Sequence, residues 1–343
     1  MSLDVSIGLG LELAYGDPEN AVTSVRGFEG RADSWKTSRE YVESTGFRAE
    51  TQTARADRRN IVEMGGEGEL ELALLDGGMG ALFSAAFDRA TVTAGGAGKP
   101  VTGVYETAAS VEPRSYVVEV VRPATDGARY RYRHHGAVVT ELELSQEVGD
   151  PLLAKASFDF QRVTDALADT ALPVRYPTSS RAYDWTDGYV ELTCPGEQPV
   201  RVPVTSWSVS LSRGLKTDRR HIRGSAYKAV PARASLPEYG GSLQAELTRT
   251  THRLYQSFTR GEVCALRIVY GPNFTVELPA VQMTGNSPEA SLDDLTSIEL
   301  EYRALDPGDG RAAARLTYVD SFGDDPREAA IPPESTPDEG DGS

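Results

Sequence analysis

Two pairs of glutamates, Glu69 with Glu71 and Glu141 with Glu143, have a spacing that could support chemistry. Side chains two positions apart on a β-strand project from the same face, and paired carboxylates can act as general acid and base. An alternating strand with one solvated face gives the same spacing without catalysis. We interpret both pairs as solvent-facing strand residues and expect no catalytic residues.

The four histidines do not form a pattern that is typical of metal binding. His134 and His135 are adjacent, so on a strand they point to opposite faces and cannot easily bind one metal ion. His221 and His252 stand alone in the chain. We expect all four histidines to be surface or turn residues, and we expect no metal site.

The cysteines and a glycine-rich segment also fail the tests for a cofactor or a nucleophile. Cys194 and Cys264 are too few for a disulfide framework, have no zinc-binding spacing and have no nearby histidine. The segment Gly95–Pro100 imitates a phosphate-binding loop but lacks the Ser or Thr that would follow Lys99. The sequence therefore predicts a protein that is not an enzyme and that has no cofactor.

Charge limits the possible partners. The 343 residues carry a net charge of −16, of which the last 23, from Ser321 to Ser343, contribute seven acidic and one basic side chain. Affinity for nucleic acid comes mainly from neutralising phosphates, so we expect no specific DNA binding, although the chain could line a passage to which DNA must not adhere. No apolar run is long enough to span a membrane, and the N-terminus does not resemble a signal peptide.

One basic concentration interrupts this acidic chain, between Gly46 and Arg59. It consists of Arg48, Arg55, Arg58 and Arg59. The segment is either a solvated hairpin arm or an arm that contacts acidic surfaces of a neighbouring subunit. We therefore regard these arginines as a candidate intersubunit arm.

Alternation with a period of two residues dominates the chain and predicts a mostly-β fold. Val139–Leu144, Ala154–Phe160, Val204–Leu211 and Val263–Tyr270 each have one apolar and one polar face, as expected for antiparallel sheets. Helical spacing is confined to two short segments, 80–87 and 250–258.

Composition suggests the domain boundaries. We expect a first module at 1–163 that includes a long loop at 90–112, a linker at 164–184, a second module at 185–320 and a disordered acidic tail at 321–343. The linker prediction comes from its prolines and serines, and the loop prediction from its Gly, Ala and Thr content.

The two halves share an order of elements that indicates a tandem duplication. In each half a glycine turn leads into an alternating strand and then a short helix, at 66–72 and again at 240–247. Further along, 137–140 and the strand ending at Phe160 resemble 280–283 and the strand ending at Leu300. The offset falls from about 174 to 140–143 residues, as expected if only the first half contains the long loop.

The N-terminal half resembles the tail tube (major tail) proteins of phages with long non-contractile tails, the siphovirus type, especially those of actinobacterial hosts. The resemblance lies in the order of loose motifs: Ser6–Pro18 with its Tyr-Gly-Asp-Pro turn, a strand arm at Ser38–Gly46, Arg58-Arg59, and Gly66–Leu70 before a short helix. Residues 188–305 resemble the second tube module of two-module members, and the whole resemblance covers about residues 5–320.

The resemblance implies two tandem β-sandwich or barrel-like modules, each with a short flanking helix and long β-hairpin arms. It implies self-assembly into stacked rings around an acidic bore, with three chains and pseudo-sixfold symmetry, or alternatively six chains. Stacked rings also need axial contacts, and we expect residues 2–18, 35–59 and 90–112 to make them, because these segments are long and lack a core-forming pattern. Implied partners are other copies of the chain, the tape measure protein and genomic DNA in the lumen, and tail terminator and baseplate proteins at the ends. The location would be the virion tail, after assembly in the host cytoplasm.

Two alternative interpretations remain. The chain could be another β-rich virion component, namely a tail terminator, a baseplate hub or a capsid decoration protein. It could also be a carbohydrate-binding β-sandwich, in which Trp35, Trp185, Trp207, Tyr183 and Tyr189 stack on sugars, although core packing explains these aromatic residues more simply.

Overall fold

The computed structural model of the chain describes residues 5–320 except 18–21, 23, 44–45, 47–52, 54, 94–99, 111–113, 168–170, 178, 286 and 289–294. Strands dominate the described residues. Their helices are α1 (Gly80–Ala86), α2 (His252–Arg260) and a 3-10 turn, η1 (Ala56–Arg58). The mostly-β fold with two short helices is therefore confirmed, while the predicted acidic tail lies outside the described residues.

One antiparallel sheet, which we call the continuous sheet, runs through both halves of the chain. Its strands alternate apolar and polar side chains, so one face enters the core and the other faces outward. Its spatial order is β3 (Gly30–Glu43), β4 (Arg59–Ala73), β9 (Leu153–Phe160), β8 (Arg129–Glu147), β14 (Ser206–Ser212), β17 (Glu238–Glu246) and β20 (Ser297–Ala304).

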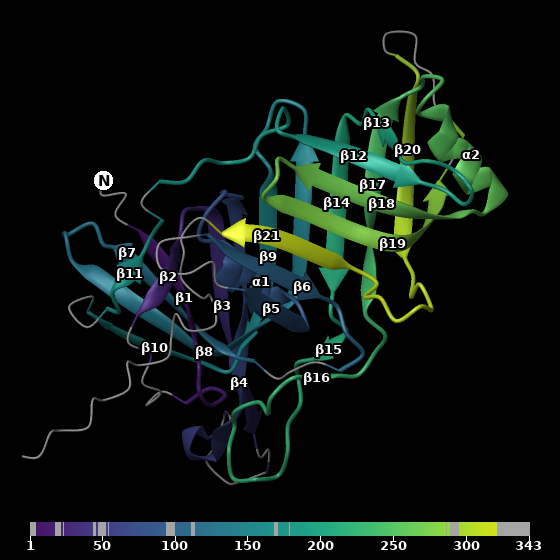
Figure 1. Cartoon of the computed structure of the whole chain (residues 1–343). Coiled ribbons are helices and arrows are strands. Elements are labelled where there is room, and N and C mark those ends of the chain that lie inside the picture. Colours follow the sequence, from purple (N-terminus) through teal and green to yellow (C-terminus); the bar gives the residue numbers. More distant parts are fainter. Residues whose placement is uncertain are drawn as a thin grey trace, which may run out of the picture.

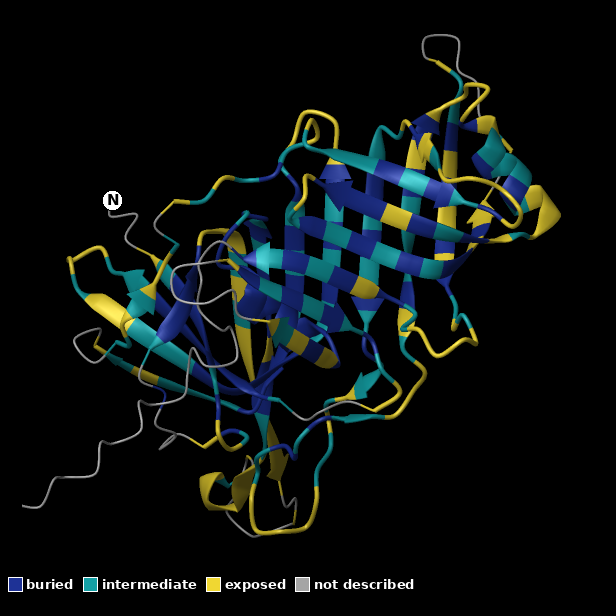
Figure 2. Ribbon diagram, in the orientation of Figure 1, coloured by how far each residue is buried: buried dark blue, intermediate teal, exposed yellow. Residues whose placement is uncertain are grey.

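A second layer, the covering sheet, packs over the apolar face of the continuous sheet. Figure 1 shows its strands crossing in front of β14, β17 and β20, and Figure 2 shows them as a checkerboard of buried and more exposed residues. The two layers join at β19, whose last residues also pair with β20. The order is β13 (Val200–Val202), β12 (Gly188–Thr193), β18 (Val263–Tyr270), β19 (Phe274–Gly285), β21 (Arg315–Asp320), β6 (Val101–Glu106) and β5 (Arg89–Thr93).

A third group of strands forms an N-terminal sheet on the first half of β8. The long strand β8 thus belongs to two sheets, and a separate hairpin of β15 (Leu215–Lys216) and β16 (Ala232–Arg233) follows β14. The order of the N-terminal sheet is β11 (Val174–Arg175), β2 (Val25–Phe28), β1 (Ser6–Leu11), β7 (Tyr116–Pro123), β8 and β10 (Arg162–Leu167).

One hydrophobic core extends through both halves. At its centre Phe83 of α1 contacts Tyr105, Phe274 and Tyr318, which come from widely separated parts of the chain. All seven residues of α1 are buried, and the Asp320 carboxylate accepts hydrogen bonds from the backbone N–H groups of Gly78 and Gly80 at the start of the helix. The end of the second half therefore holds the helix of the first half in place.

The pairings of the first half recur in the second. β12 pairs with β13 and β18 as β1 pairs with β2 and β7. β14 pairs with β17, which leads to α2, as β3 pairs with β4, which leads to α1. β19 pairs with β18 and β20 as β8 pairs with β7 and β9. The β5–β6 hairpin has no counterpart between α2 and β18.

Two segments that composition assigned to loops contain strands, and those predictions were wrong. Residues 90–112 hold most of β5 and all of β6. β6 forms a strand because Val101, Gly103 and Tyr105 alternate toward the core and because its backbone pairs with β21. The segment 164–184 holds the end of β10, which pairs with β8, and β11, which pairs in parallel with β2. Among the segments expected to contact the next ring, 2–18 likewise contains β1, which is paired on both edges.

Candidate functional site

The outward face of the continuous sheet is acidic. The register places Ser34, Glu69, Ser157, Glu141 and Ser212 in one row across five strands, so their side chains share this face. Basic residues on the same face are Lys36, Lys155 and Arg303. The acidic ones outnumber them: Glu67, Glu69, Glu71, Glu141, Glu143, Glu147, Asp159, Glu238, Glu246, Glu299 and Glu301.

Apart from Asp159, which is buried and paired with Lys228, this face is solvated and only weakly neutralised. The ion pairs of Lys36 with Glu67 and of Lys155 with Glu69 both measure 3.5 Å between exposed side chains, and such pairs contribute about 0–1 kcal/mol. β14 contributes serines in alternate positions, and the Ser210 hydroxyl donates to the Glu141 carboxylate over 2.7 Å. The two glutamate pairs noted in the sequence belong to this face, where they make a field that repels phosphate.

The two halves meet at the β8–β14 junction, where Glu141–Glu147 pair with Ser206–Ser212. Beside it the Asp88 carboxylate, almost fully buried, accepts from Arg213 Nε at 3.3 Å and from Arg233 Nη2 at 2.9 Å. Arg213 also donates to the carbonyls of Ala85 and Val139. Burial lowers the pKa of Arg213, and the Asp88 charge opposes that shift.

This cluster could not be found from the sequence. Asp88 lies 125 residues before Arg213 and 145 before Arg233, and no local pattern marks a pair so far apart. The only available signal was an acidic residue directly after a predicted apolar helix.

Three of the four arginines of the candidate arm lie in the described residues, while Arg48 lies outside them. Arg55 pairs with Asp57 through two hydrogen bonds, the longer of 2.8 Å, and Arg59 pairs with Glu43 at 3.1 Å. Arg58 is exposed in η1. β3 and the start of β4 extend from the sandwich (Figure 1), and Arg55 and Arg59 contact acidic residues of the same segment.

The adjacent histidines are buried, which corrects the expectation of surface positions. At this point β8 is covered on both faces: the His134 ring stacks on Trp35 at 4.6 Å, and His135 Nδ1 lies 3.7 Å from the Glu12 carboxylate. Burial lowers the pKa of His134 to about 4. Both residues therefore belong to the packing around β8.

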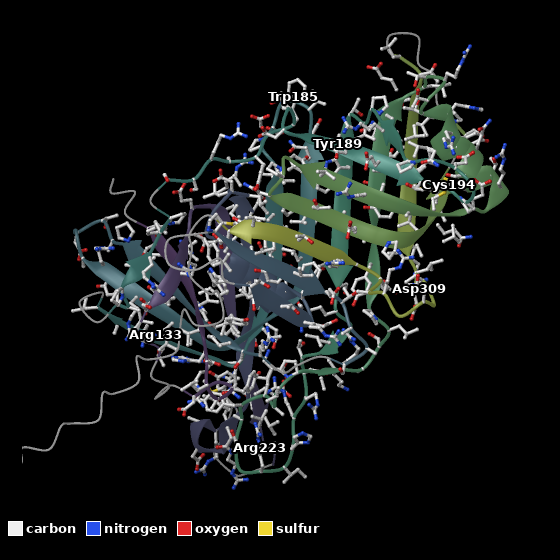
Figure 3. The ribbon with its side chains drawn as sticks, in the orientation of Figure 1. Arg133, Trp185, Tyr189, Cys194, Arg223 and Asp309 are labelled. Carbon is white, nitrogen blue, oxygen red and sulfur yellow. A yellow bond between two sulfur atoms is a disulfide. The ribbon has the colours of Figure 1, made fainter. Side chains whose placement is uncertain are left out.

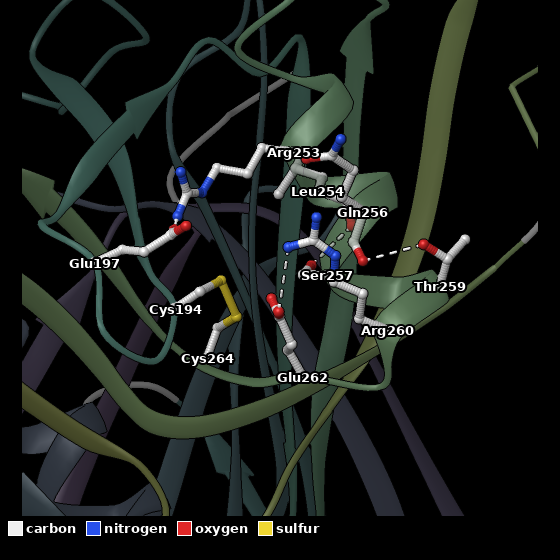
Figure 4. The surroundings of a disulfide bond; sticks show 10 residues. All are labelled: Cys194, Glu197, Arg253, Leu254, Gln256, Ser257, Thr259, Arg260, Glu262 and Cys264. Carbon is white, nitrogen blue, oxygen red and sulfur yellow. Dashed lines mark hydrogen bonds and ion pairs between the residues drawn. A yellow bond between two sulfur atoms is a disulfide. The ribbon is translucent and has the colours of Figure 1, made fainter.

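The two cysteines form a disulfide that joins the residue after β12 to β18, and Glu262 lies beside it (Figure 4). Cys194, Cys264 and Glu262 are the one group of three potential metal ligands found in the part of the chain that the structure describes. Because both sulfur atoms are bonded to each other, this group offers no thiolate to a metal ion.

The aromatic residues considered for sugar stacking are divided between the core and one surface hollow. Trp207 and Tyr183 are buried, and Trp35 packs on His134 and Phe158. Trp185 and Tyr189 line a hollow of about 270 Å³ at the end of the β8–β14 junction, and Figure 3 labels both near the edge of the sandwich. The Arg201 guanidinium covers one face of the Tyr189 ring at 3.8 Å, which leaves less of this ring for stacking on a sugar.

Comparison with known proteins identifies one family. The sequence model described as phage tail tube protein matches residues 2–304 of the chain. A search of curated proteins gives no match. Among the described residues, neither α-helix has the length and apolar character needed to span a membrane.

Proposed function

The chain belongs to the phage tail tube protein family, and from this premise we propose that it assembles into stacked rings that form the hollow tail tube of a siphovirus-like phage. DNA would pass through this tube during ejection. The observation that carries the proposal is the continuous sheet, which has one acidic outward face and runs through both halves of the chain.

We propose that the two halves are tandem tube modules that arose by duplication. The support is the recurrence of pairings: β1-β2-β7 and β12-β13-β18, then β3-β4-β9-β8 and β14-β17-β20-β19. The β5–β6 hairpin accounts for the fall in sequence offset between the halves. Each half would then supply a four-stranded section of the wall.

The β8–β14 junction suggests how rings are built. It joins the last strand of one section to the first strand of the next by an antiparallel ladder. The same contact between chains would satisfy the outer edge of β3 and continue the sheet, because an unpaired sheet edge is a ready site for strand addition. Three chains would give six sections and a closed wall, as cyclic symmetry requires; six chains are the alternative.

The acidic face would line the bore. Glu67, Glu69 and Glu71 on one section and Glu299 and Glu301 on the other would repel phosphate, so DNA could pass without adhering. Further proposed partners are the tape measure protein in the lumen and the tail terminator and baseplate proteins at the tube ends. Assembly in the host cytoplasm and a purely structural, non-enzymatic role complete the proposal.

Electron microscopy of the purified full chain tests this function directly. We expect hollow tubes or rings in a concentrated sample and a high copy number in purified phage tails. A protein that stays monomeric under all conditions and is rare in virions would contradict the proposal and favour a terminator, hub or decoration protein instead.

A further inference from the structure

The two ends of the continuous sheet are exposed and lie at opposite sides of the molecule. β3 is at one end, and β20 with the last residues of β19 is at the other, next to α2 (Figure 1). Thr284 and Gly285 of β19 are exposed, whereas their counterparts Glu141 and Leu142 on β8 pair with β14. Only Leu254 and Ser257 of α2 are buried, whereas all of α1 is buried.

The recurring pairings allow residues at the two ends to be matched with residues at the β8–β14 junction. Leu70 of β4 and Leu243 of β17 are buried at corresponding places, and they pair with Asp33 of β3 and Trp207 of β14. Arg39 lies six positions after Asp33, and Arg213 lies six positions after Trp207. The two arginines therefore occupy corresponding places.

The acidic partner of Arg213 also has a counterpart. Asp88 is the first residue after Phe87, the C-cap of α1, and Glu262 is the first residue after Gly261, the C-cap of α2. Asp88 binds two arginines. Glu262 binds Arg260 at 3.5 Å, and its side chain remains 30% exposed. A second arginine at Glu262 would reproduce the arrangement around Asp88.

We propose that Arg39 of one copy of the chain pairs with Glu262 of the next copy, at a junction in which β3 adds to β19 as β14 adds to β8. The partner is a second copy because Arg39 and Glu262 have opposite charge and matching positions at the two free ends.

The recurring pairings also give the register of this junction between copies. Within the chain, Glu141 of β8 pairs with Ser212 of β14 and, on its other side, with Ser157, which lies three residues before the end of β9. Thr284 of β19 pairs with Glu301, which lies three residues before the end of β20. Thr284 therefore corresponds to Glu141. Ser38 of one copy therefore faces Thr284 of the next. This inference rests on the proposed ring assembly.

Charge exchange tests the pair in the full-length chain. We expect Arg39→Glu alone and Glu262→Arg alone to raise the concentration needed for tube assembly about tenfold or more, because each places like charges in contact. The double variant Arg39→Glu/Glu262→Arg should return this concentration to within about threefold of wild type, because the exchanged charges attract each other again. Arg311→Glu is the matched control: Arg311 is exposed and pairs with Asp309 at 2.7 Å, and this variant should assemble normally.

The outcomes separate this inference from the function on which it rests. If wild type forms tubes and the single variants assemble equally well, or the double variant is no better than either single variant, the Arg39–Glu262 pair is refuted and the tube function stands. If wild type forms no tubes, the proposed function fails first.

A second measurement does not depend on charge. In oxidised assemblies of the variant Ser38→Cys/Thr284→Cys, we expect cross-linked species on a non-reducing gel, the largest with as many copies as one ring. Each single-cysteine variant is the control and should stay uncross-linked. Efficient assembly without any such cross-link would refute the register.

Discussion

The buried carboxylate of Asp88 provides the sharpest test of how the two halves are held together. The perturbation is Asp88→Asn, which removes the charge and keeps the size of the side chain. Asp88 is 1% exposed in its side chain, and Arg213 is 5% exposed. The guanidinium of Arg213 would therefore stay buried without its counter-charge.

The magnitude follows from this burial. Breaking a buried ion pair by removing one partner costs about 3–5 kcal/mol, because a desolvated charge is left unpaired. Arg213 keeps its hydrogen bonds to the carbonyls of Ala85 and Val139, and Arg233 is partly exposed and can reach solvent. We therefore expect a loss of about 3 kcal/mol in the free energy of unfolding, at the lower end of that range.

Urea unfolding of the monomeric protein, followed by tryptophan fluorescence, measures this change. Asp309→Asn is the control: it removes an exposed charge that pairs with Arg311 at 2.7 Å, and it should cost less than about 1 kcal/mol. If Asp88→Asn destabilised the protein no more than Asp309→Asn, the cluster would not hold the two halves together, and the reasoning about the β8–β14 junction would be wrong.

Three further predictions follow from other parts of the structure. Replacing Cys194 and Cys264 together by serine should lower the free energy of unfolding by about 4 kcal/mol, since the disulfide closes a loop with a sequence separation of 70 residues; equal stability with and without reductant would contradict this. The pKa of His134 is lowered to about 4 from 6.5, so as pH falls the unfolded chain takes up a proton first and stability is lost between these values. From pH 7.5 to 5, urea unfolding should show wild type losing about 2 kcal/mol more than His134→Gln, and parallel pH curves would refute it. Finally, Glu141→Lys/Glu143→Lys tubes should retain short DNA fragments on sedimentation at low salt while wild-type tubes do not; equal retention would mean that this face does not line the bore.

Local pattern was enough to predict the strands and helices with strong periodicity. The helix predicted at 80–87 is observed at Gly80–Ala86, and the one predicted at 250–258 is observed at His252–Arg260. Alternation in Val139–Leu144 correctly indicated a strand with one buried face. In these segments the side chains that decide burial lie within a few residues of one another, so the sequence carries the whole signal.

Features that depend on distant pairing could not be predicted. β6 was mistaken for a loop because the Gly, Ala and Thr content around it hid a short alternation, and one of its two partner strands, β21, lies more than 200 residues away. His134 and His135 were expected at the surface because the sequence does not reveal that β8 is covered on both faces. The disulfide and the Asp88 cluster depend in the same way on which strands become neighbours.

The candidate arm was only partly predictable. Composition correctly located a basic segment in an otherwise acidic chain, and the structure places Arg55 and Arg59 on an exposed hairpin, each beside an acidic neighbour. The role of the arm between subunits stays a prediction. Arg39, which lies on the same hairpin, was not singled out because a single arginine in a polar strand carries no local signal.

We propose that the β8–β14 junction within the chain is repeated between chains. Cryo-electron microscopy of tubes assembled from the full chain, viewed down the tube axis, would show this junction. We predict rings of three copies with threefold symmetry, in which both halves contribute their section of the continuous sheet to the inner wall and β3 pairs with β19 of the next copy. Rings of six copies with the second half outside the wall would contradict the claim.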